Sequence, residues 1–295
     1  MKTFICSLIF LVFFFGGYAQ ELESILEQES QETSFNVAET FKGTRIANGH
    51  SIETRKKGIL DFLITHRFGT LNSGAYELWG LDEANIRLAL EYALTDDLTF
   101  ALGRSSYEKT YDGYIKYRLF HQKEGDKPFP VGITLFGSAA IRTLKDFDPD
   151  NEPSFSDKLS YASQILIARR FSQNFSLQIM PTYIHFNQVP KTADPNGMFA
   201  LGLGARIKLS KRMAINGEYY YNFNQFESFE TFNSLSVGVE FETGGHVFQL
   251  VFTNSRPMIE KGFIAETTGD FFDGDIHFGF NISRSFQVKK SSRGK

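Results

Sequence analysis

The sequence predicts an all-β protein, a transmembrane antiparallel up-and-down β-barrel of about 12 strands. Three observations support this fold class. Apolar and polar residues alternate with a period of two along most of the chain, most of the alternating runs are nine to thirteen residues long, and short and long connections alternate between them. Strands of soluble domains cluster near ~5 to 6 residues, whereas a tilted strand needs about 9 to 11 residues to cross a bilayer.

The composition agrees with a membrane as the surroundings of this chain. Of the 295 residues, 32 are phenylalanine, which is about twice the share found in ordinary soluble proteins. The formal net charge of -3 comes from 31 basic and 34 acidic residues, so the chain lacks the broad cationic surface that nucleic-acid binding requires. The sequence therefore predicts no nucleic-acid partner.

Residues 1–19 have the pattern of a secretory signal peptide. Lys2 supplies a positive charge, residues 4–15 form an apolar run, and Gly17 and Ala19 place small residues near the cleavage site. Cys6, the only cysteine, would be removed with this segment. The exported chain would then have no disulfide framework, and its stability would come from burial or from a membrane.

The exported chain is predicted to begin with an acidic periplasmic segment, residues 20–57. Its first part, residues 21–34, carries five glutamates and no basic residue. Residues 39–57 precede the first predicted strand, where they could plug the lumen or hold a periplasmic partner. The sequence favours a mobile tail over either of these.

The predicted barrel, residues 58–288, is built from alternating runs, of which residues 86–94 are the clearest. Ile86 and Leu88 lie on one face of this run, while Arg87 and Glu91 lie on the other. The same reading down the chain predicts strands at 59–68, 86–94, 98–105, 111–121, 130–141, 159–169, 175–185, 198–209, 213–223, 233–243, 246–254 and 274–286.

The connections place short links at one end of the barrel and long links at the other. Membrane barrels have this arrangement, with tight periplasmic turns and longer external loops. The link at residues 122–129 is a mild exception, because it is longer than the other predicted turns. The short links are 95–97, 170–174, 210–212 and 244–245, and the long ones are 69–85, 142–158, 186–197, 224–232 and 255–273.

The polar faces of these strands mix small and charged residues, which suits a watery interior, so they are predicted to line the lumen. Phe120 and Phe136 fall on the same inward faces and would narrow it. The charged lumen-lining candidates are seven acidic residues, Asp61, Glu91, Asp112, Glu218, Glu240, Glu242 and Asp275, and seven basic residues, Arg67, Arg87, Lys116, Arg118, Arg142, Arg206 and Lys208.

A basic tail, residues 289–295, follows the last predicted strand. Barrel-assembly machinery reads a terminal strand that ends in an aromatic residue, so Phe286 is predicted to be the effective end of the barrel. The predicted partners are outer-membrane lipid and this machinery, with a small-molecule solute as a further candidate.

Several loop and turn sequences resemble those of a known family. They are Gly49–Thr54 (GHSIET), Thr65–Gly69 (THRFG), Gly74–Asp82 (GAYELWGLD), Glu108–Gly113 (EKTYDG), Glu242–His246 (ETGGH) and Gly274–Phe280 (GDIHFGF). Over residues 40–286 the chain resembles a family of uncharacterised β-barrel proteins encoded in Bacteroidota. This resemblance implies an outer-membrane barrel without an established activity, so it assigns no catalytic or ligand residue.

The polar interior predicts a narrow porin-like passage for small solutes, because twelve strands fall between small filled barrels and the larger porins. A non-conducting structural or partner-binding barrel is the alternative, in which opposite charges pair across the lumen. A lipid hydrolase is a weaker alternative. His185 as its base would need a nucleophilic serine within hydrogen-bond reach, and outward Ser163 on the neighbouring strand is four residues out of register. The sequence predicts neither an enzyme nor a cofactor.

One acidic loop bears a weak similarity to a calcium-binding loop. Its sixth position is Asn151 instead of the glycine that the turn requires, and Pro149 stiffens it, so a solvated acidic loop is the simpler interpretation. The candidate ligands, at positions one, three, five and twelve, are Asp146, Asp148, Asp150 and Asp157.

Overall fold

The computed structural model of the protein describes residues 34–145 and 153–288. The predicted signal peptide, the first part of the acidic segment and the basic tail lie outside these residues. The described chain forms two units, a small one from residues 34–37 and 122–130 and a larger one from the remaining residues.

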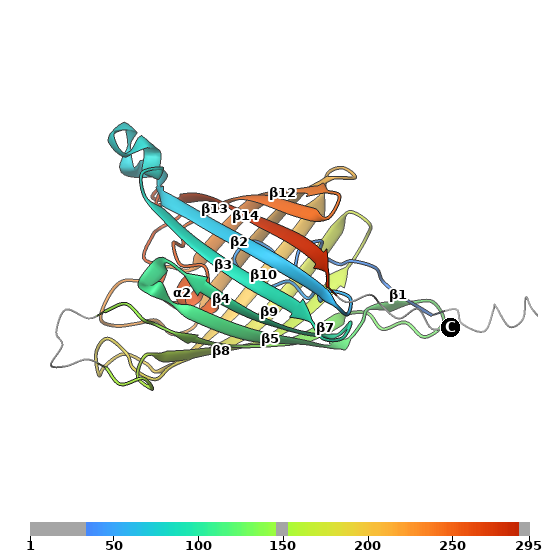
Figure 1. Ribbon diagram of the computed structural model, residues 1–295, viewed down its shortest axis with the longest axis horizontal. Coiled ribbons are helices and arrows are strands. Elements are labelled where there is room, and N and C mark those ends of the chain that lie inside the picture. Colours follow the sequence, from blue (N-terminus) through green and yellow to red (C-terminus); the bar gives the residue numbers. More distant parts are fainter. Residues whose placement is uncertain (1–33, 146–152, 289–295) are drawn as a thin grey trace, which may run out of the picture. The chain divides into compact units, whose positions relative to one another are not determined.

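The larger unit is a closed barrel of twelve antiparallel strands within the described residues, in which the last strand pairs with the first (Figure 1). The predicted fold class and strand count are therefore confirmed, and every predicted strand end lies within three residues of an observed one. The strands are β2 (Ile59–Thr70), β3 (Ala84–Ala93), β4 (Leu98–Ser105), β5 (Tyr111–Phe120), β7 (Gly132–Ile141), β8 (Leu159–Arg170), β9 (Phe175–Phe186), β10 (Gly197–Lys208), β11 (Met213–Asn222), β12 (Ser234–Thr243), β13 (His246–Thr253) and β14 (His277–Gln287).

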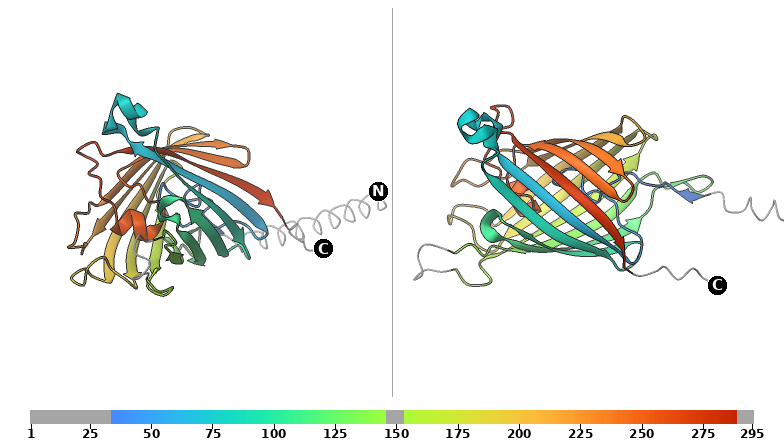
Figure 2. Two further views of the ribbon diagram at one scale, coloured as in Figure 1. Left: turned by 60° about the vertical axis from the view of Figure 1, so that its left-hand side comes forward. Right: turned by 45° about the horizontal axis from the view of Figure 1, so that its top comes forward.

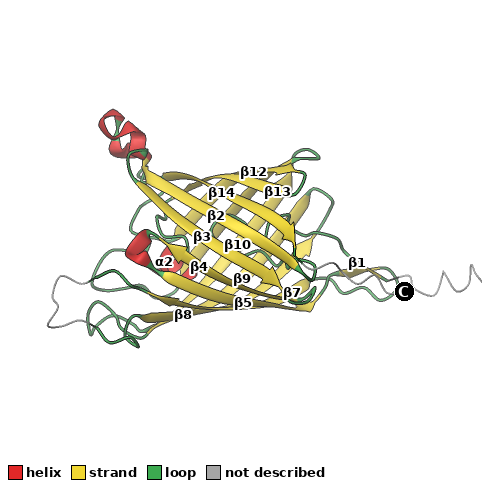
Figure 3. Ribbon diagram, in the orientation of Figure 1, coloured by secondary structure: helices red, strands yellow, loops and turns green. Residues whose placement is uncertain are grey.

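Long and short connections alternate around this barrel. We call the end that carries the connections 71–83, 106–110, 142–158, 187–196, 223–233 and 254–276 the loop end, and the opposite end the turn end. The helices belong to the loop end (Figure 3): η1 (Leu71–Ser73), η2 (Ala75–Gly80), η3 (Tyr107–Lys109) and α2 (Glu260–Ala265). In the described part of the chain, no helix has the length and apolar character needed to cross a membrane.

The smaller unit is a two-stranded antiparallel sheet of β1 (Phe35–Asn36) and β6 (Lys123–Glu124). The backbone N–H of Val37 donates to the carbonyl of Gln122 at 2.8 Å and extends the pairing by one bond. The unusual length of the 122–129 link thus has a structural reason, because this link supplies one strand of a second sheet.

The faces of the barrel strands are arranged as the alternation predicts. In β3, Arg87 and Glu91 are buried inside the barrel, whereas Leu88 and Leu90 on the outer face are 43% and 51% exposed. An outer face of this composition suits lipid, because hydrocarbon has no hydrogen bonds to offer polar groups. Closure of the ladder also removes the open sheet edges that lipid would not tolerate.

Two features interrupt the regular ladder. The register of β5 against β7 shifts between Arg118 and Phe120, and Phe120 is consequently 50% exposed. The prediction that Phe120 faces the lumen was wrong because such a shift turns the following side chain to the other face. Phe136 does face inward and is buried.

The second interruption lies between β8 and β9. Paired residues run up to Gln164 and Thr182 and resume at Ile167 and Ile179. Pro181, which lacks a backbone N–H, occupies the interval.

Candidate functional site

A segment that precedes the first strand fills the barrel interior. Residues 38–57, which we call the plug, run inside the ring of strands (Figure 2) and make hydrogen bonds to inward side chains on opposite sides of the wall. For residues 39–57, the favoured expectation of a mobile tail was therefore wrong. The inward polar side chains bind the plug backbone and so fix this segment in place.

The plug is itself folded into a small hairpin, residues 43–51. Arg45 and His50 form an antiparallel bridge, and the N–H of Ser51 donates to the carbonyl of Thr44 at 3.0 Å. The turn closes with the N–H of Ile46 donating to the carbonyl of Gly49 at 2.8 Å. These bonds satisfy part of the backbone locally and leave the tip of the hairpin to be bound by the wall.

The tip of the hairpin is held by one carboxylate. Glu218 of β11 accepts hydrogen bonds from three successive backbone N–H groups, those of Ala47 (3.2 Å), Asn48 (2.7 Å) and Gly49 (3.0 Å). Gly49 also leaves room for Tyr220, because a Cβ at this position would lie 2.2 Å from the Tyr220 hydroxyl oxygen. The position of the tip therefore depends on the buried carboxylate of Glu218 and on a glycine at residue 49.

The side chain of Asn48 connects the tip to three further strands. Its Nδ2 donates to Ser236 Oγ (3.1 Å) of β12 and Thr253 Oγ1 (3.2 Å) of β13, and its Oδ1 accepts from Arg67 Nη2 (2.7 Å) of β2. The adjacent Ala47 carbonyl accepts from Asn281 Nδ2 of β14 at 2.7 Å. One side of the hairpin thus spans β2 and β11 to β14.

The other side of the plug is bound from β5 and β9. Lys116 Nζ donates to the Glu53 carbonyl (2.6 Å), and Arg118 Nη2 donates to the Ile52 carbonyl (2.7 Å). Gln178 binds the plug twice, accepting from the Ile52 N–H and donating to the His50 carbonyl, both at 2.7 Å. Contacts on opposite walls mean that the plug crosses the lumen.

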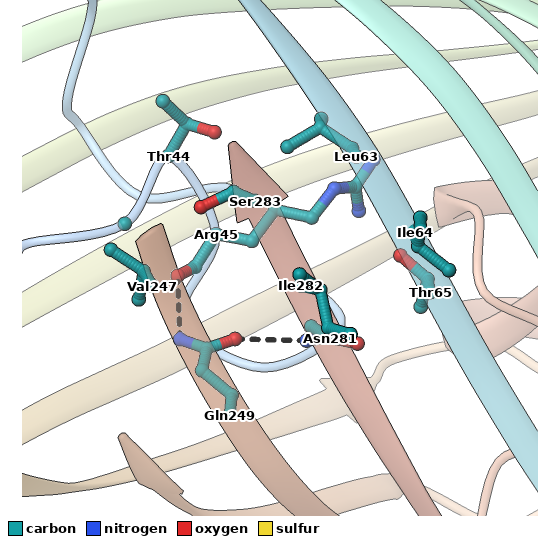
Figure 4. A pocket seen from close by; sticks show the side chains of 11 residues that line it. Thr44, Arg45, Leu63, Ile64, Thr65, Val247, Gln249, Asn281, Ile282 and Ser283 are labelled. Carbon is teal, nitrogen blue, oxygen red and sulfur yellow. Dashed lines mark hydrogen bonds between the residues drawn. The ribbon is translucent and has the colours of Figure 1, made fainter. Parts of the chain in front are cut away.

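A small cavity of about 20 Å³ remains between the hairpin and strands β2, β13 and β14. Figure 4 shows that Gln249 of β13 connects the hairpin to β14. Its Nε2 donates to the Arg45 carbonyl (3.3 Å), and its Oε1 accepts from Asn281 (2.9 Å). A cavity of this volume has space for about one water molecule. The hairpin therefore fits this part of the wall closely.

The loop end also contacts the plug, through α2. The carboxylate of Glu260 lies 3.3 Å from His50 Nε2 and 3.6 Å from Arg45 Nη1. Burial raises the pKa of Glu260, although the nearby Arg45 guanidinium opposes this effect. Glu260 is thus the point at which a surface loop and the plug meet.

The structure places twelve of the fourteen predicted lumen-lining residues on the inward faces of the strands. Five form hydrogen bonds to the plug: Arg67, Lys116, Arg118 and Glu218, and also Asp61, which accepts from plug residue Arg55 at 2.7 Å. The rest pair with one another or with wall residues: Arg87 with Asp112, Glu91 with Tyr114, and Arg206 with Glu240 and Glu242, while Lys208 is half-buried at the end of β10. Glu242 also lies 3.5 Å from Nζ of plug residue Lys42.

The other two candidates lie in loop-end connections, beyond the ends of the strands. Arg142 follows β7 and lies 3.3 Å from Glu108. Asp275 precedes β14, which begins at His277, and accepts from Asn72 Nδ2 at 2.7 Å. The alternation of apolar and polar residues appeared to continue into Asp275. Its side chain instead connects the loop 254–276 to the loop 71–83 and does not line the lumen.

The candidate calcium ligands and His185 are the remaining residues that the sequence singled out. Of the calcium-loop residues, Asp146, Asp148 and Asp150 lie outside the described residues. Asp157 accepts from the backbone N–H (2.9 Å) and the hydroxyl (2.7 Å) of Ser154. His185 is on the outer face, with its ring 6.5 Å from that of Tyr161 and 6.4 Å from that of Tyr183, which suits an interfacial aromatic belt.

A second cavity, of about 400 Å³, opens at the loop end, and we call it the mouth pocket. Phe186, Val189, Phe226 and Phe229 form its apolar part. Its polar part includes Lys261, whose Nζ lies 2.8 Å from both Glu108 and Glu266. These two carboxylates raise the pKa of Lys261 against the opposing effect of burial, so the lysine is charged.

Sequence reasoning missed two groups of residues. Plug residue Gly49 begins a motif, Gly49–Thr54, that resembled the family but had no assigned role, and this motif was the available signal. Asn48 directly precedes the motif and was not singled out. The apolar inward residues, such as Met180 and Ile184, were passed over because apolar side chains were expected on the outer face.

The closed strand ladder, the apolar outer face and the plugged polar interior define a membrane-bound β-barrel. The chain belongs to the family described as Membrane bound beta barrel domain (DUF5777), which matches residues 41–286. The match begins within the plug, so the family includes most of this segment as well as the strands. A search of curated proteins found no match.

Several solved barrels share the general fold at low similarity. NanC porin is 8% identical, with 78% of this chain and 100% of that chain covered and a TM-score of 0.46. KdgM porin is 9% identical (77% and 99% covered, TM-score 0.45), and the COG4313 outer membrane channel from Pseudomonas putida F1 is 14% identical (80% and 98% covered, TM-score 0.46). No function is inferred from these similarities.

Proposed function

We propose that the protein is exported to the outer membrane and forms a passage for small solutes that its own N-terminal segment closes. The signal-peptide pattern supports export, and the fold supports the outer membrane, because closed barrels and helices are the two structures that satisfy every backbone group in lipid. The resemblance to a Bacteroidota family stays a prediction about the source. The proposal contains no enzymatic step.

One observation carries this proposal: a separate segment fills the interior, where a filled barrel would use side chains of its own strands. The plug joins the barrel covalently at residue 58, and the strand ladder is complete without it. It can therefore leave the lumen without breaking a bond between strands. The charged wall that it would leave behind suits water.

The density of the plug contacts favours a second candidate, a barrel that stays closed and acts as a structural or partner-binding protein. Hydrogen bonds reach the plug from β2, β5, β7, β9 and β11 to β14. Each bond contributes about 0.5–1.5 kcal/mol net, and those to charged groups more. Their sum is large enough that opening would need an external trigger.

Planar-bilayer conductance separates the two candidates. We expect the wild-type protein to pass little current and a variant lacking residues 38–57 to conduct continuously. A variant with residues 43–51 in scrambled order, which keeps the length of the plug, is the matched control and should also conduct, because its side chains no longer fit the wall. A deletion variant that is correctly folded and still passes no current would favour the permanently closed barrel.

A further inference from the structure

The lumen wall has two unlike sides. Charged and polar residues dominate β11 to β14 and β2 to β5, but β7 to β10 present a buried apolar stripe that runs from the middle of β7 and β8 to the loop end of β9 and β10. Two polar side chains within it, Gln164 and Thr182, hydrogen-bond to each other at 2.9 Å. The stripe consists chiefly of Phe136, Leu166, Met180, Ile184, Phe186 and Met198.

Apolar side chains from outside the strands cover this stripe. Phe41, Ile46 and Ile52 of the plug belong to the same buried cluster, as do Phe263 and Ile264 of α2. All five are at most 2% exposed. Exposing this apolar surface to water in an open lumen would cost about 25 cal/mol per Å². The closed state therefore hides a surface that a passage for ions does not need.

The stripe continues into the mouth pocket. Phe186 and Phe226 line the pocket and belong to the buried cluster, and Val189 and Phe229 pack against that cluster from the pocket side. The pocket, of about 400 Å³, falls within the size range of small-molecule sites. Its apolar side faces a polar side that includes Glu108, Lys261 and Glu266. The apolar side of the pocket and the stripe therefore form one surface from the loop end to the centre of the barrel.

We propose that the solute is a small molecule with an apolar body, bound first in the mouth pocket and then along the stripe in place of the plug and α2 side chains. This inference rests on the proposed function and names its substrate class. Such a solute gains the burial energy that Ile46 and Phe263 supply in the closed state. An ion gains nothing from this surface.

Binding of tritiated naphthalene to the protein in lipid nanodiscs tests the capture step, with empty nanodiscs subtracted. We expect saturable binding that Phe226→Ser and Phe229→Ser each weaken about fivefold or more, since each removes an aromatic wall of the pocket. Phe272→Ser is the matched control, because Phe272 is 86% exposed in a loop-end connection and does not line the pocket. Absence of saturable binding, or equal binding by all variants, would overturn the inference.

The variants must be folded for this comparison, and migration in unheated detergent gels reports that. Phe229 is only partly buried, so Phe229→Ser keeps the test valid if Phe226→Ser does not fold.

Permeation tests the stripe and separates this inference from the proposed function. In the barrel lacking residues 38–57, Met180→Glu should reduce naphthalene flux about fivefold or more, because it places a charge in the stripe. Thr99→Glu adds the same charge to an inward position of β4 outside the stripe and should leave the flux within twofold. If both variants reduce the flux equally while ion conductance persists, the substrate class is wrong and the passage stands. If the plug-deleted barrel carries neither ions nor naphthalene, the passage itself is wrong.

Discussion

At the scale of single residues, closure depends on how near the hairpin tip comes to the wall. Gly49 has an ordinary negative φ, so its role is to allow close approach. A Cβ there would lie 2.2 Å from the Tyr220 hydroxyl oxygen and 3.2 Å from Glu218 Oε2. The first contact is far shorter than real Cβ atoms make, and Tyr220 is fully buried, so either the Tyr220 ring or the hairpin tip must move.

Gly49→Ala is therefore expected to destabilise the closed state by about 1–3 kcal/mol, the usual range for overpacking. A loss of 1.4 kcal/mol corresponds to about tenfold more time in the open state. Single-channel recording measures this open fraction. Gly244→Ala is the matched control, since a Cβ at that turn position meets nothing within 4 Å. Equal open fractions in the two variants would show that the tip does not control closure.

At the scale of elements, two loop-end connections that carry the mouth pocket are joined by one carboxylate. Asp194 accepts hydrogen bonds from its own loop, at Lys191 N–H (2.9 Å), and from the loop 223–233, at Glu227 N–H (2.8 Å) and Ser228 N–H (2.9 Å). Burial opposes the charged form, but the bonds from Ser228 and its neighbours outweigh it and lower the pKa of Asp194. The loops that supply Val189, Phe226 and Phe229 are thus held together by this charge.

A lowered carboxyl pKa gives this contact a defined pH dependence. Its stabilisation is present above the ordinary carboxyl value of 3.8 and is lost as the pH falls below that value through the lowered pKa. Asp194→Asn should weaken the contact at neutral pH, because it removes the charge and one of the two acceptor oxygens, and so speed amide hydrogen exchange at Glu227 and Ser228. Asp273→Asn, at an exposed loop position, is the matched control. Unchanged exchange in Asp194→Asn would show that the loops are held by other contacts.

The elements also show why sequence reasoning succeeded for the outside of the barrel and failed for part of the inside. Alternation determines which face meets lipid, and Leu88 and Leu90 follow it without exception. On the inward face, the favoured residue type depends on what packs against it. Met180 is apolar there because Ile46 and Phe263 cover the stripe and exclude water from it. Phe120 was misplaced because a register shift leaves no mark in a pattern of period two.

The plug was the hardest part to foresee because its partners are distant in the sequence. Glu218 lies 170 residues after Asn48, and neither residue shows by itself that it has a partner. Charge balance among the inward residues left pairing inside the lumen as the alternative, and Arg206 does pair with Glu240 two strands away. A pairing with backbone groups cannot be read from charge alone.

At the scale of the whole molecule, the barrel and its plug are stabilised in different ways. Each strand is hydrogen-bonded to two neighbours around the closed ring, and the outer face is stabilised by lipid. The plug is held by side chains of the wall and by one apolar cluster. Removing the plug therefore takes away stabilising contacts while leaving every bond between strands intact.

Deletion of residues 38–57 should accordingly yield a folded barrel with a lower melting temperature. Loss of the plug leaves Arg67, Lys116 and Glu218 without their present partners, but water entering the lumen solvates these charges, so the net cost is a few kcal/mol and the decrease about 5–15 °C. Migration in unheated detergent gels reports the fold, and circular dichroism against temperature reports the melting. An unfolded deletion variant would mean that the barrel needs the plug to form, and an unchanged melting temperature would mean that the hydrogen bonds at the hairpin tip contribute nothing to the stability of the closed state.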